Sequence, residues 1–213
     1  MLGWIRWDKG RRIRMERETV LGLPLLVLYL PERMRGQGRR AEKGAALLAA
    51  HRVTRVLTPP AFAWWPVLTQ AGLRPVETQS LRCMLLPVWV KAAMASGERP
   101  LEQAVIRLSG TRETPDMVLA ARRLCPVVRH LVIDTPGGET LAAQLRREYG
   151  MPVLPARSVR ADLTVRFECG PVMEGAVFAL KGHELPADCE VLPLLSALWE
   201  SGRIKTEDIA ILV

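Results

Sequence analysis

The sequence predicts an α/β protein: a Rossmann-like, doubly wound and mostly parallel sheet built from two βαβαβ halves. One observation behind this prediction is an internal duplication, since residues 52–76 recur about 77 residues further along the chain. Six positions keep their residue type between the copies, and each copy closes a helix with a glycine, Gly72 or Gly150. A second observation is that short apolar runs alternate with amphipathic segments in both copies. Duplicated βαβαβ units commonly build doubly wound sheets.

The first half of the predicted fold follows a short N-terminal hairpin. Residues 1–19 are expected to form this β-hairpin, because the polar tripeptide at 8–10 separates two runs with large apolar side chains and Gly10 tolerates a tight turn. Residues 20–79 form the first βαβαβ half. Its first strand is the continuously apolar run 24–30, which is typical of a strand covered on both faces. Its other elements are predicted to be a helix at 38–52, a strand at 53–57, a helix at 62–71 and a strand at 74–77.

The second half is reached through a helix within residues 80–100, which Pro87 is expected to kink or split. Residues 101–157 form the second βαβαβ half, and residues 158–213 form a C-terminal β/α extension. The predicted strands of these two segments are 104–108, 131–133, 153–154, 163–167 and 177–180. The predicted helices are one with Thr114 as its N-cap, two over 139–149 and 192–200, and a short last one that starts at Thr206. No low-complexity linker interrupts the chain. We therefore expect a single domain over residues 1–213.

Composition and charge narrow the class of protein. The chain has 213 residues, of which 49% are hydrophobic and 24% charged, as expected of a globular protein. Residues 1–55 hold 13 Lys and Arg against 5 Asp and Glu, so the whole net charge of +8 lies in this quarter. Such a basic segment suits nucleic acid, an anionic membrane surface, a phosphate-bearing ligand or an acidic protein partner. The alternative is an ordinary solvated surface.

Neither a membrane span nor a metal site is predicted. The longest apolar run, residues 20–30, is about half of the roughly 20 residues that a spanning helix needs. No secretory signal is visible at the N-terminus, so a cytoplasmic location is expected. The four cysteines are widely spread and are expected to be buried or unreactive thiols. The spacing of Cys169, His183 and Cys189 matches no structural zinc pattern.

Ligands of doubly wound sheets bind beyond the carboxyl ends of the strands, where the strand order reverses. If the halves join as in a dinucleotide-binding fold, this crevice lies between the strands that end at Leu30 and Leu108. The loops 31–38 and 109–114 then form its walls. An anion held between both loops is the combination that we expect.

The first of these loops is basic and rich in glycine. Residues 36–41 read G-x-G-x-x-A, so that Gly36 and Gly38 would let a phosphate approach backbone amides at a helix start. Arg35, Arg39 and Arg40 would instead hold the additional phosphate of NADP. Against this, the first glycine comes about five residues late for a tight turn, and the second strand ends without an acidic residue. The alternative is a plain flexible loop.

The second loop and the strand end beside it carry hydroxyl, basic and acidic groups. Four residues before a helix start are candidate anion donors: Ser109, Gly110, Thr111 and Arg112. A merely capped helix start is the alternative. Asp134, at the end of a central strand, is a candidate acceptor for a ribose hydroxyl or a candidate base. The alternative there is a turn residue.

Three functions are compatible with these patterns. The first is a non-catalytic Rossmann-like module that binds a nucleotide-like or phosphate-bearing ligand, or a protein partner such as a second copy. The second is an NAD(P)-dependent oxidoreductase with its cofactor at the Gly36 loop. The third is a nucleic-acid-associated protein that uses the basic first quarter. No Gly-x-Ser-x-Gly, His-Glu-x-x-His or Walker lysine motif occurs, so the sequence leaves open whether the protein is an enzyme.

Overall fold

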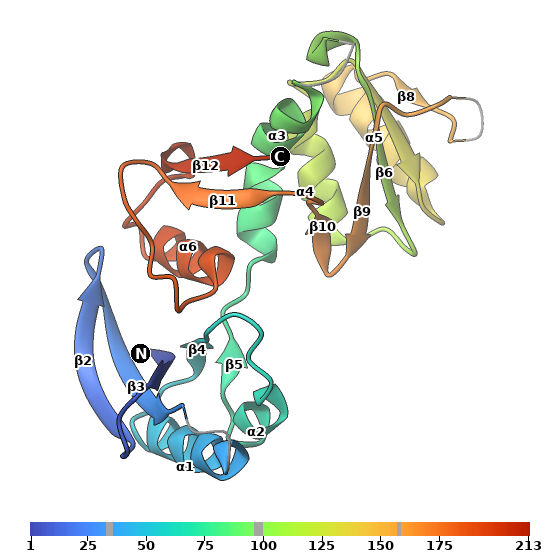
Figure 1. The fold of residues 1–213 in the computed structure, drawn as a ribbon. Coiled ribbons are helices and arrows are strands. Elements are labelled where there is room, and N and C mark those ends of the chain that lie inside the picture. Colours follow the sequence, from blue (N-terminus) through green and yellow to red (C-terminus); the bar gives the residue numbers. More distant parts are fainter. Residues whose placement is uncertain (33–35, 96–99, 157–158) are drawn as a thin grey trace. The chain divides into compact units, whose positions relative to one another are not determined.

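The computed structural model describes residues 1–32, 36–95, 100–156 and 159–213. The fold is α/β and Rossmann-like, as predicted, with mostly parallel sheets. The chain forms two compact units, whereas the sequence predicts a single domain over 1–213. Unit 1 comprises Met1–Thr78 and Ala179–Asp208, and unit 2 comprises Gln79–Phe178 and Ile209–Val213 (Figure 1).

Unit 1 contains a five-stranded sheet with the strand order β2-β3-β1-β4-β5. Strand β1 lies in the middle and runs parallel to its neighbours β3 and β4, and β5 extends the parallel part of the sheet. Strand β2 runs antiparallel to β3 at the edge. The strands are β1 (Leu2–Asp8), β2 (Arg14–Val20), β3 (Leu23–Pro31), β4 (Arg55–Leu57) and β5 (Arg74–Pro75).

The prediction of a β-hairpin over residues 1–19 is wrong. Strands β1 and β2 do not pair, because β3 lies between them. The hairpin of this unit is β2–β3, and its turn places Leu21 at φ 48° and Gly22 at φ 79°. Two adjacent residues with positive φ are what a tight hairpin turn requires, since their twist matches that of the strands. Strand β1 instead takes a central, buried position that an apolar strand favours.

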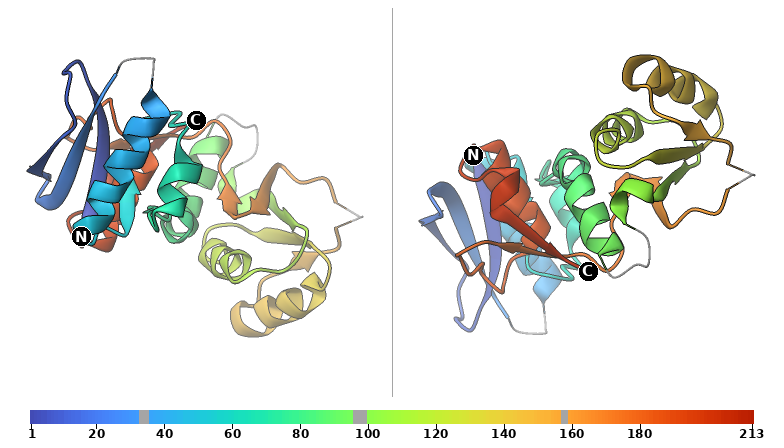
Figure 2. Two further views of the ribbon diagram at one scale, coloured as in Figure 1. Left: turned by 90° about the horizontal axis from the view of Figure 1, so that it is seen from below. Right: turned by 90° about the horizontal axis from the view of Figure 1, so that it is seen from above.

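The helices of unit 1 cover both faces of its sheet. Helices α1 (Gln37–Ala50) and α2 (Trp65–Gln70) pack against each other, and α6 (Val191–Glu200) lies on the opposite face of the sheet from α1 (Figure 2). A Cβ atom on Gly44 of α1 would come within 2.6 Å of Leu28 Cδ2, so the helix lies very close to β3. A core forms between α1 and the sheet, with Ile5, Leu28 and Leu48 fully buried.

The C-terminal segment returns to unit 1 and is tied to it by backbone and charged contacts. The Glu190 amide donates to the Thr58 carbonyl at 3.0 Å, and the Ser196 hydroxyl donates to the Glu77 carbonyl at 2.6 Å. Ahead of α6, Asp188 forms an ion pair with Arg6 of β1. Residues far apart in the sequence therefore complete the second helical layer of this unit.

Unit 2 contains the other five-stranded sheet, with the order β10-β9-β6-β7-β8. Its four parallel strands, numbered along the chain, follow the order 3-2-1-4 of a dinucleotide-binding half. Strand β10 is antiparallel to β9. The elements are α3 (Gln79–Met94), η1 (Leu101–Gln103), β6 (Val105–Gly110), α4 (Pro115–Leu124), β7 (His130–Asp134), α5 (Gly138–Tyr149), β8 (Val153–Leu154), β9 (Leu163–Glu168) and β10 (Gly170–Val172).

The prediction that both halves share one sheet is wrong, and the strand order gives the reason. In a shared sheet, β3 and β6 would meet at the junction of the halves. Strand β3 is flanked on its outer side by β2, and β6 is flanked on its outer side by β9. Segments outside the duplication therefore occupy the edges that would have joined.

The remaining elements are short. Strands β11 (Val177–Leu180) and β12 (Ile209–Leu212) form a two-stranded sheet, and η2 (Thr206–Asp208) replaces the short last helix expected from the sequence. Helix α3 is continuous through Pro87, so this residue does not split it. Within the described residues, no helix combines the length and the apolar composition needed to cross a membrane.

Candidate functional site

The residues predicted to bind an anion lie in two different units. Gly36, Gly38 and Arg39 begin α1 of unit 1. The loop from Ser109 to Arg112 follows β6 of unit 2, and Asp134 ends β7 of the same sheet. The expectation that both loops flank one switch point is wrong, because β3 and β6 belong to separate sheets. Arg35 lies outside the described residues.

Unit 1 has a cavity at the carboxyl ends of its parallel strands. Strands β1 and β4 are neighbours in the sheet, but the chain leaves them in opposite directions. From β1 it continues to β2 and β3 on one side, and from β4 it continues through α2 to β5 on the other side. The strand order therefore reverses between β1 and β4. A cavity of about 670 Å³ opens beside these strand ends. Its lining residues, called the aromatic cavity below, are Trp7, Lys9, Glu32, Gln37, Ala61, Phe62, Ala63 and Trp64.

Aromatic rings form much of the wall of this cavity. The ring of Phe62 lies 5.9 Å from that of Trp7, centroid to centroid, with an interplanar angle of 30°. On its other side, Phe62 meets Trp65 edge to face at 6.1 Å. Ala61, at φ 56°, adopts a left-handed backbone conformation that alanine rarely takes. Such strain is retained where surrounding structure fixes it and is common at binding sites.

The start of α1 borders the same cavity through Gln37. Gly36 is its N-cap at φ 77°, and no side chain of the described residues caps the helix. The Arg40 amide donates to the Gly36 carbonyl at 3.2 Å, which leaves the amides of the preceding turn without an intrahelical acceptor. No acidic residue lies in the first turn. Because the N-terminus of a helix carries a partial positive charge, this end of α1 favours an anion.

Gly38 has a packing role that the sequence does not indicate. Its φ is not in the left-handed region, and a Cβ at this position would lie 3.1 Å from the Trp64 ring. Gly38 thus lets the first turn of α1 approach an aromatic wall of the cavity. Gly36 provides the left-handed backbone from which the helix starts.

Two exposed basic residues lie at the aromatic cavity or at the helix start beside it. Lys9 lines the cavity, and Arg39 lies in the first turn of α1; both side chains are exposed. Among the residues that the structure describes, neither forms an ion pair. Glu32 is the acidic residue of the lining. The unpaired cations would attract a negatively charged ligand.

Unit 2 has its own cavity at the carboxyl ends of β6, β7 and β8. Its volume is about 810 Å³. The register pairs Ser109 with Asp134, so the hydroxyl and the carboxylate stand side by side at this edge. The lining residues, called the acidic cavity below, are Ser109, Gly110, Ile133, Asp134, Thr135, Pro136, Gly138, Glu139, Ala142, Arg146, Val153, Leu154, Pro155 and Ala156.

Arg107 of β6 fixes the Asp134 carboxylate. Its Nη1 lies 3.3 Å from Asp134 Oδ2, and its Nη2 donates to the carbonyls of Ala156 at 3.1 Å and Val159 at 3.0 Å. Asp134 is therefore neither a simple turn residue nor an isolated base. Arg107 was not predicted as a site residue, although an arginine inside an otherwise apolar strand is unusual and is a signal in the sequence.

The loop between β6 and α4 ends in a capped helix start. The Thr114 hydroxyl accepts a hydrogen bond from the Met117 amide at 3.2 Å, Pro115 occupies the first turn and Asp116 follows it. The predicted N-cap is confirmed. Thr111 and Arg112 are exposed and do not line the acidic cavity.

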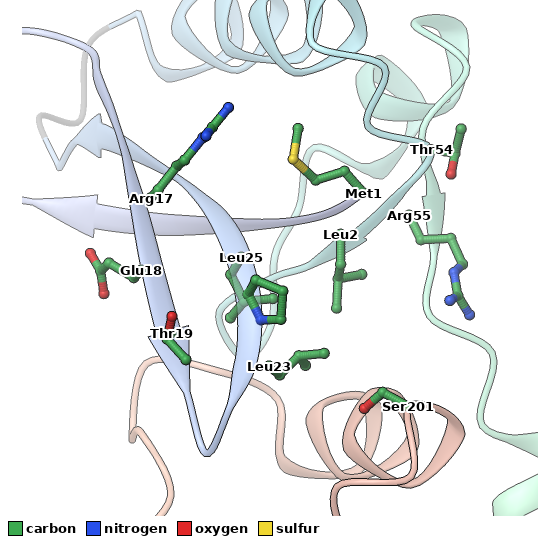
Figure 3. A pocket seen from close by; sticks show the side chains of 11 residues that line it. Met1, Leu2, Arg17, Glu18, Thr19, Leu23, Leu25, Thr54, Arg55 and Ser201 are labelled. Carbon is green, nitrogen blue, oxygen red and sulfur yellow. The ribbon is translucent and has the colours of Figure 1, made fainter.

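A third cavity, of about 740 Å³, lies at the opposite, amino edge of the unit 1 sheet. Figure 3 shows Leu2 and Leu23 on the side of Ser201, whereas Arg17 extends the other way. Arg55, which also lines this cavity, forms a hydrogen-bonded ion pair with Glu200. None of the residues singled out in the sequence lines it.

The thiols and the acidic side chains form no metal site in the described part of the chain. Burial raises the pKa of Cys83 to about 12, and burial with nearby carboxylates raises the pKa of Cys189 to about 12. Both thiols therefore stay protonated at neutral pH. Cys169 is exposed.

No family model matches the sequence, and no curated protein shows significant similarity to it. Among solved structures, the chain is similar to L-tryptophan dehydrogenase from Nostoc punctiforme, with 16% identity and a TM-score of 0.33. The match covers 69% of this chain and 44% of that chain, so it spans less than half the length of the dehydrogenase. We draw no functional argument from this likeness.

Proposed function

We propose that unit 1 is a non-catalytic binding module for a nucleotide-like, phosphate-bearing ligand, which occupies the aromatic cavity. The observation that carries the proposal is that this cavity joins a cluster of aromatic rings to a helix start without an acidic residue, at the carboxyl edge of a parallel sheet. Ligands of open α/β sheets bind at this edge, where the strand order reverses.

The base of the ligand stacks on the aromatic wall in this proposal. Trp7 and Trp64 are both partly exposed, so each offers ring surface to a ligand, while Phe62 is buried behind them. Stacking of one base on an aromatic side chain contributes about 1–3 kcal/mol. Such stacking tolerates different bases, since every base has a π-face. We therefore expect weak discrimination among nucleobases.

The phosphate of the ligand lies at the first turn of α1. The amides of Gln37, Gly38 and Arg39 precede the first intrahelical hydrogen bond, so they can donate to a phosphate there, and no acidic side chain lies in that turn. Lys9 and Arg39 add positive charge. A hydrogen bond to a charged group contributes about 1.5–3 kcal/mol, so each cation should strengthen binding roughly tenfold or more.

Calorimetric titration of the full chain tests this function. The probe is 2′-deoxyadenosine monophosphate (dAMP), compared with adenine and with inorganic phosphate. We expect dAMP to bind with one-to-one stoichiometry and more tightly than either fragment, because only dAMP occupies both subsites. If dAMP produces no heat of binding at millimolar concentration, or if it binds no better than adenine, the proposal fails.

Variants at the two cations sharpen this test. Lys9→Ala and Arg39→Ala should each weaken dAMP binding roughly tenfold while leaving adenine binding unchanged. Lys43→Ala is the matched control, since Lys43 is exposed on the same helix but lies beyond its first turn. Equal losses in Lys43→Ala and Arg39→Ala would assign the effect to net charge instead of a phosphate site.

Nucleic-acid binding is the competing use of the same rings and cations. A module for single strands would also combine stacking with basic groups. The two uses differ in salt dependence, because a strand that contacts several cations releases several counterions. A mononucleotide bound by two cations should lose little affinity between 50 and 200 mM salt, whereas an oligonucleotide held along a basic surface should lose on the order of 10³-fold.

A further inference from the structure

The acidic cavity of unit 2 differs chemically from the aromatic cavity. It is lined by two carboxylates, Asp134 and Glu139, and by the hydroxyls of Ser109 and Thr135. The Thr135 Oγ1 atom is buried and has no hydrogen-bond partner among the described residues. Hydroxyls and carboxylates side by side form a surface that suits a ligand rich in O–H donors.

Two arginines near this cavity, among the residues that the structure describes, already donate hydrogen bonds to the protein. Arg107 is held by Asp134 and two backbone carbonyls, and it is not a lining residue. Arg146 does line the cavity, but its Nη2 donates to the Val153 carbonyl at 2.9 Å. Of the charged lining groups, Glu139 is exposed and forms no ion pair within the described residues. The described lining thus carries two carboxylates against one guanidinium, and this excess of negative charge disfavours a phosphate.

Both helix starts near this sheet edge also disfavour a phosphate. Helix α4 is capped by the Thr114 hydroxyl and has Asp116 in its first turn. Helix α5 begins at Gly138 with Glu139 in its first turn. An acidic side chain satisfies the positive end of the helix dipole, so less attraction is left for a second anion. This contrasts with α1, whose first turn has no acid.

The position of Asp134 suits a neighbouring pair of hydroxyls. Its side chain is 42% exposed, at the end of the strand next to β6, and Arg107 restrains its orientation from the side. A carboxylate accepts hydrogen bonds through two oxygens, so it can receive O–H groups from both carbons of a vicinal diol. A restrained acceptor loses little conformational entropy on binding.

We infer that the acidic cavity is a second binding site, for a ligand that presents a vicinal diol and carries no phosphate, such as a ribose ring. Asp134 accepts from the diol, and the Ser109 hydroxyl completes the polar contacts. This inference does not rest on the function proposed for unit 1, since the two cavities share no residue.

The test uses methyl β-D-ribofuranoside, which has a diol but neither a base nor a phosphate. Binding to the full chain is followed by NMR through the backbone amides of Gly110, Thr135 and Gly138. We expect saturable shifts of these amides, roughly tenfold weaker affinity for the 2-deoxy analogue, and weaker binding of ribose 5-phosphate. Unchanged spectra, equal affinity for the 2-deoxy analogue, or tighter binding of the phosphate would each overturn the inference.

Single substitutions test whether the riboside binds in the acidic cavity. Asp134→Asn should weaken the riboside roughly tenfold or more, because it removes a charged acceptor. Glu148→Gln is the matched control, since it also breaks an ion pair with an arginine, Arg122, but lies outside the cavity. If Asp134→Asn unfolds unit 2, the inference is tested on the unaltered protein, by comparing the affinity for the riboside with that for its 2-deoxy analogue. An unchanged affinity in a folded Asp134→Asn protein contradicts the inference. Because dAMP lacks the diol, its binding is independent of this result.

Discussion

Gly38, in the first turn of α1, lies directly against the indole of Trp64, so that a Cβ atom at Gly38 would be 3.1 Å from the ring. The helix end that favours an anion and the aromatic wall that favours a base are thus in contact. Trp64 is partly exposed and lines the aromatic cavity. A change at Gly38 should therefore alter ligand binding through the position of this ring.

The substitution Gly38→Ala should weaken dAMP binding several-fold and leave stability nearly unchanged. The added methyl group moves the Trp64 ring, which is free to shift because it is partly exposed. Alanine also favours a helix by about 1 kcal/mol relative to glycine, and this gain offsets the crowding. Calorimetry measures the affinity, and urea unfolding measures the stability. An unchanged affinity for dAMP in the folded variant would show that Trp64 is not part of the binding site.

Gly44→Ala, two turns later in the same helix, should behave in the opposite way. Its Cβ would come within 2.6 Å of Leu28 Cδ2 and 3.1 Å of Leu30 Cδ2, and both leucines are fully buried. Crowding of a packed core costs about 1–3 kcal/mol and exceeds the helix gain. We expect the free energy of unfolding to fall by about 1–2 kcal/mol. The double variant with Leu28→Ala should lose less than the sum of the two single losses, and strict additivity would contradict the contact.

Arg107→Lys should destabilise unit 2 by about 1–3 kcal/mol. A lysine cannot hold Asp134 and the carbonyls of Ala156 and Val159 at once, because it lacks the planar fork of the guanidinium. Urea unfolding followed by the fluorescence of Trp89, which belongs to unit 2, measures the loss. Arg122→Lys, at a more exposed ion pair with Glu148, is the control and should change stability by less than about 0.5 kcal/mol.

The buried thiols should make stability depend on alkaline pH. Burial raises the pKa of Cys83 from 9.0 to about 12, so the folded state holds the thiol proton more tightly than the unfolded chain does. The resulting stabilisation is fully present below pH 9 and is lost as the pH rises from 9 to 12. Urea unfolding across this range should therefore show a smaller decline for Cys83→Ala than for the unaltered protein. Cys169→Ala, at an exposed thiol, should decline as the unaltered protein does.

Much of the local structure follows from the sequence. The start of α4 was predictable because Thr114, Pro115 and Asp116 form a consistent N-cap. Gly150 ends α5 at φ 62°, as a glycine after a helix should. These features depend on a few neighbouring residues, which is why a short stretch of sequence suffices to predict them.

The joining of the sheets could not be predicted in the same way. Which strand flanks β3 or β6 depends on pairing between distant segments. The duplicated strand pattern is compatible both with one shared sheet and with two separate sheets. The apolar character of β1 was visible, but its central place was not. Long-range pairing leaves no local mark in the sequence.

The candidate site was predicted in part. Gly36 and Arg39 were identified from the pattern at a helix start, whereas Trp7, Phe62 and Trp64 were missed. A signal did exist, because the segment after β4 places Phe62, Trp64 and Trp65 within eight residues of a strand end. Aromatic residues at this edge of a parallel sheet are unusual for a loop and favour a ligand site.

Fluorine NMR of the full chain labelled with 5-fluorotryptophan tests the central proposal most directly. The six tryptophans are assigned by single Trp→Phe variants, and dAMP is then added to saturation. The proposed site requires that the resonances of Trp7 and Trp64 shift with one common dissociation constant, while those of Trp89 and Trp199, outside the aromatic cavity, stay in place. Shifts confined to other tryptophans, or none at millimolar dAMP, would contradict a nucleotide site in unit 1.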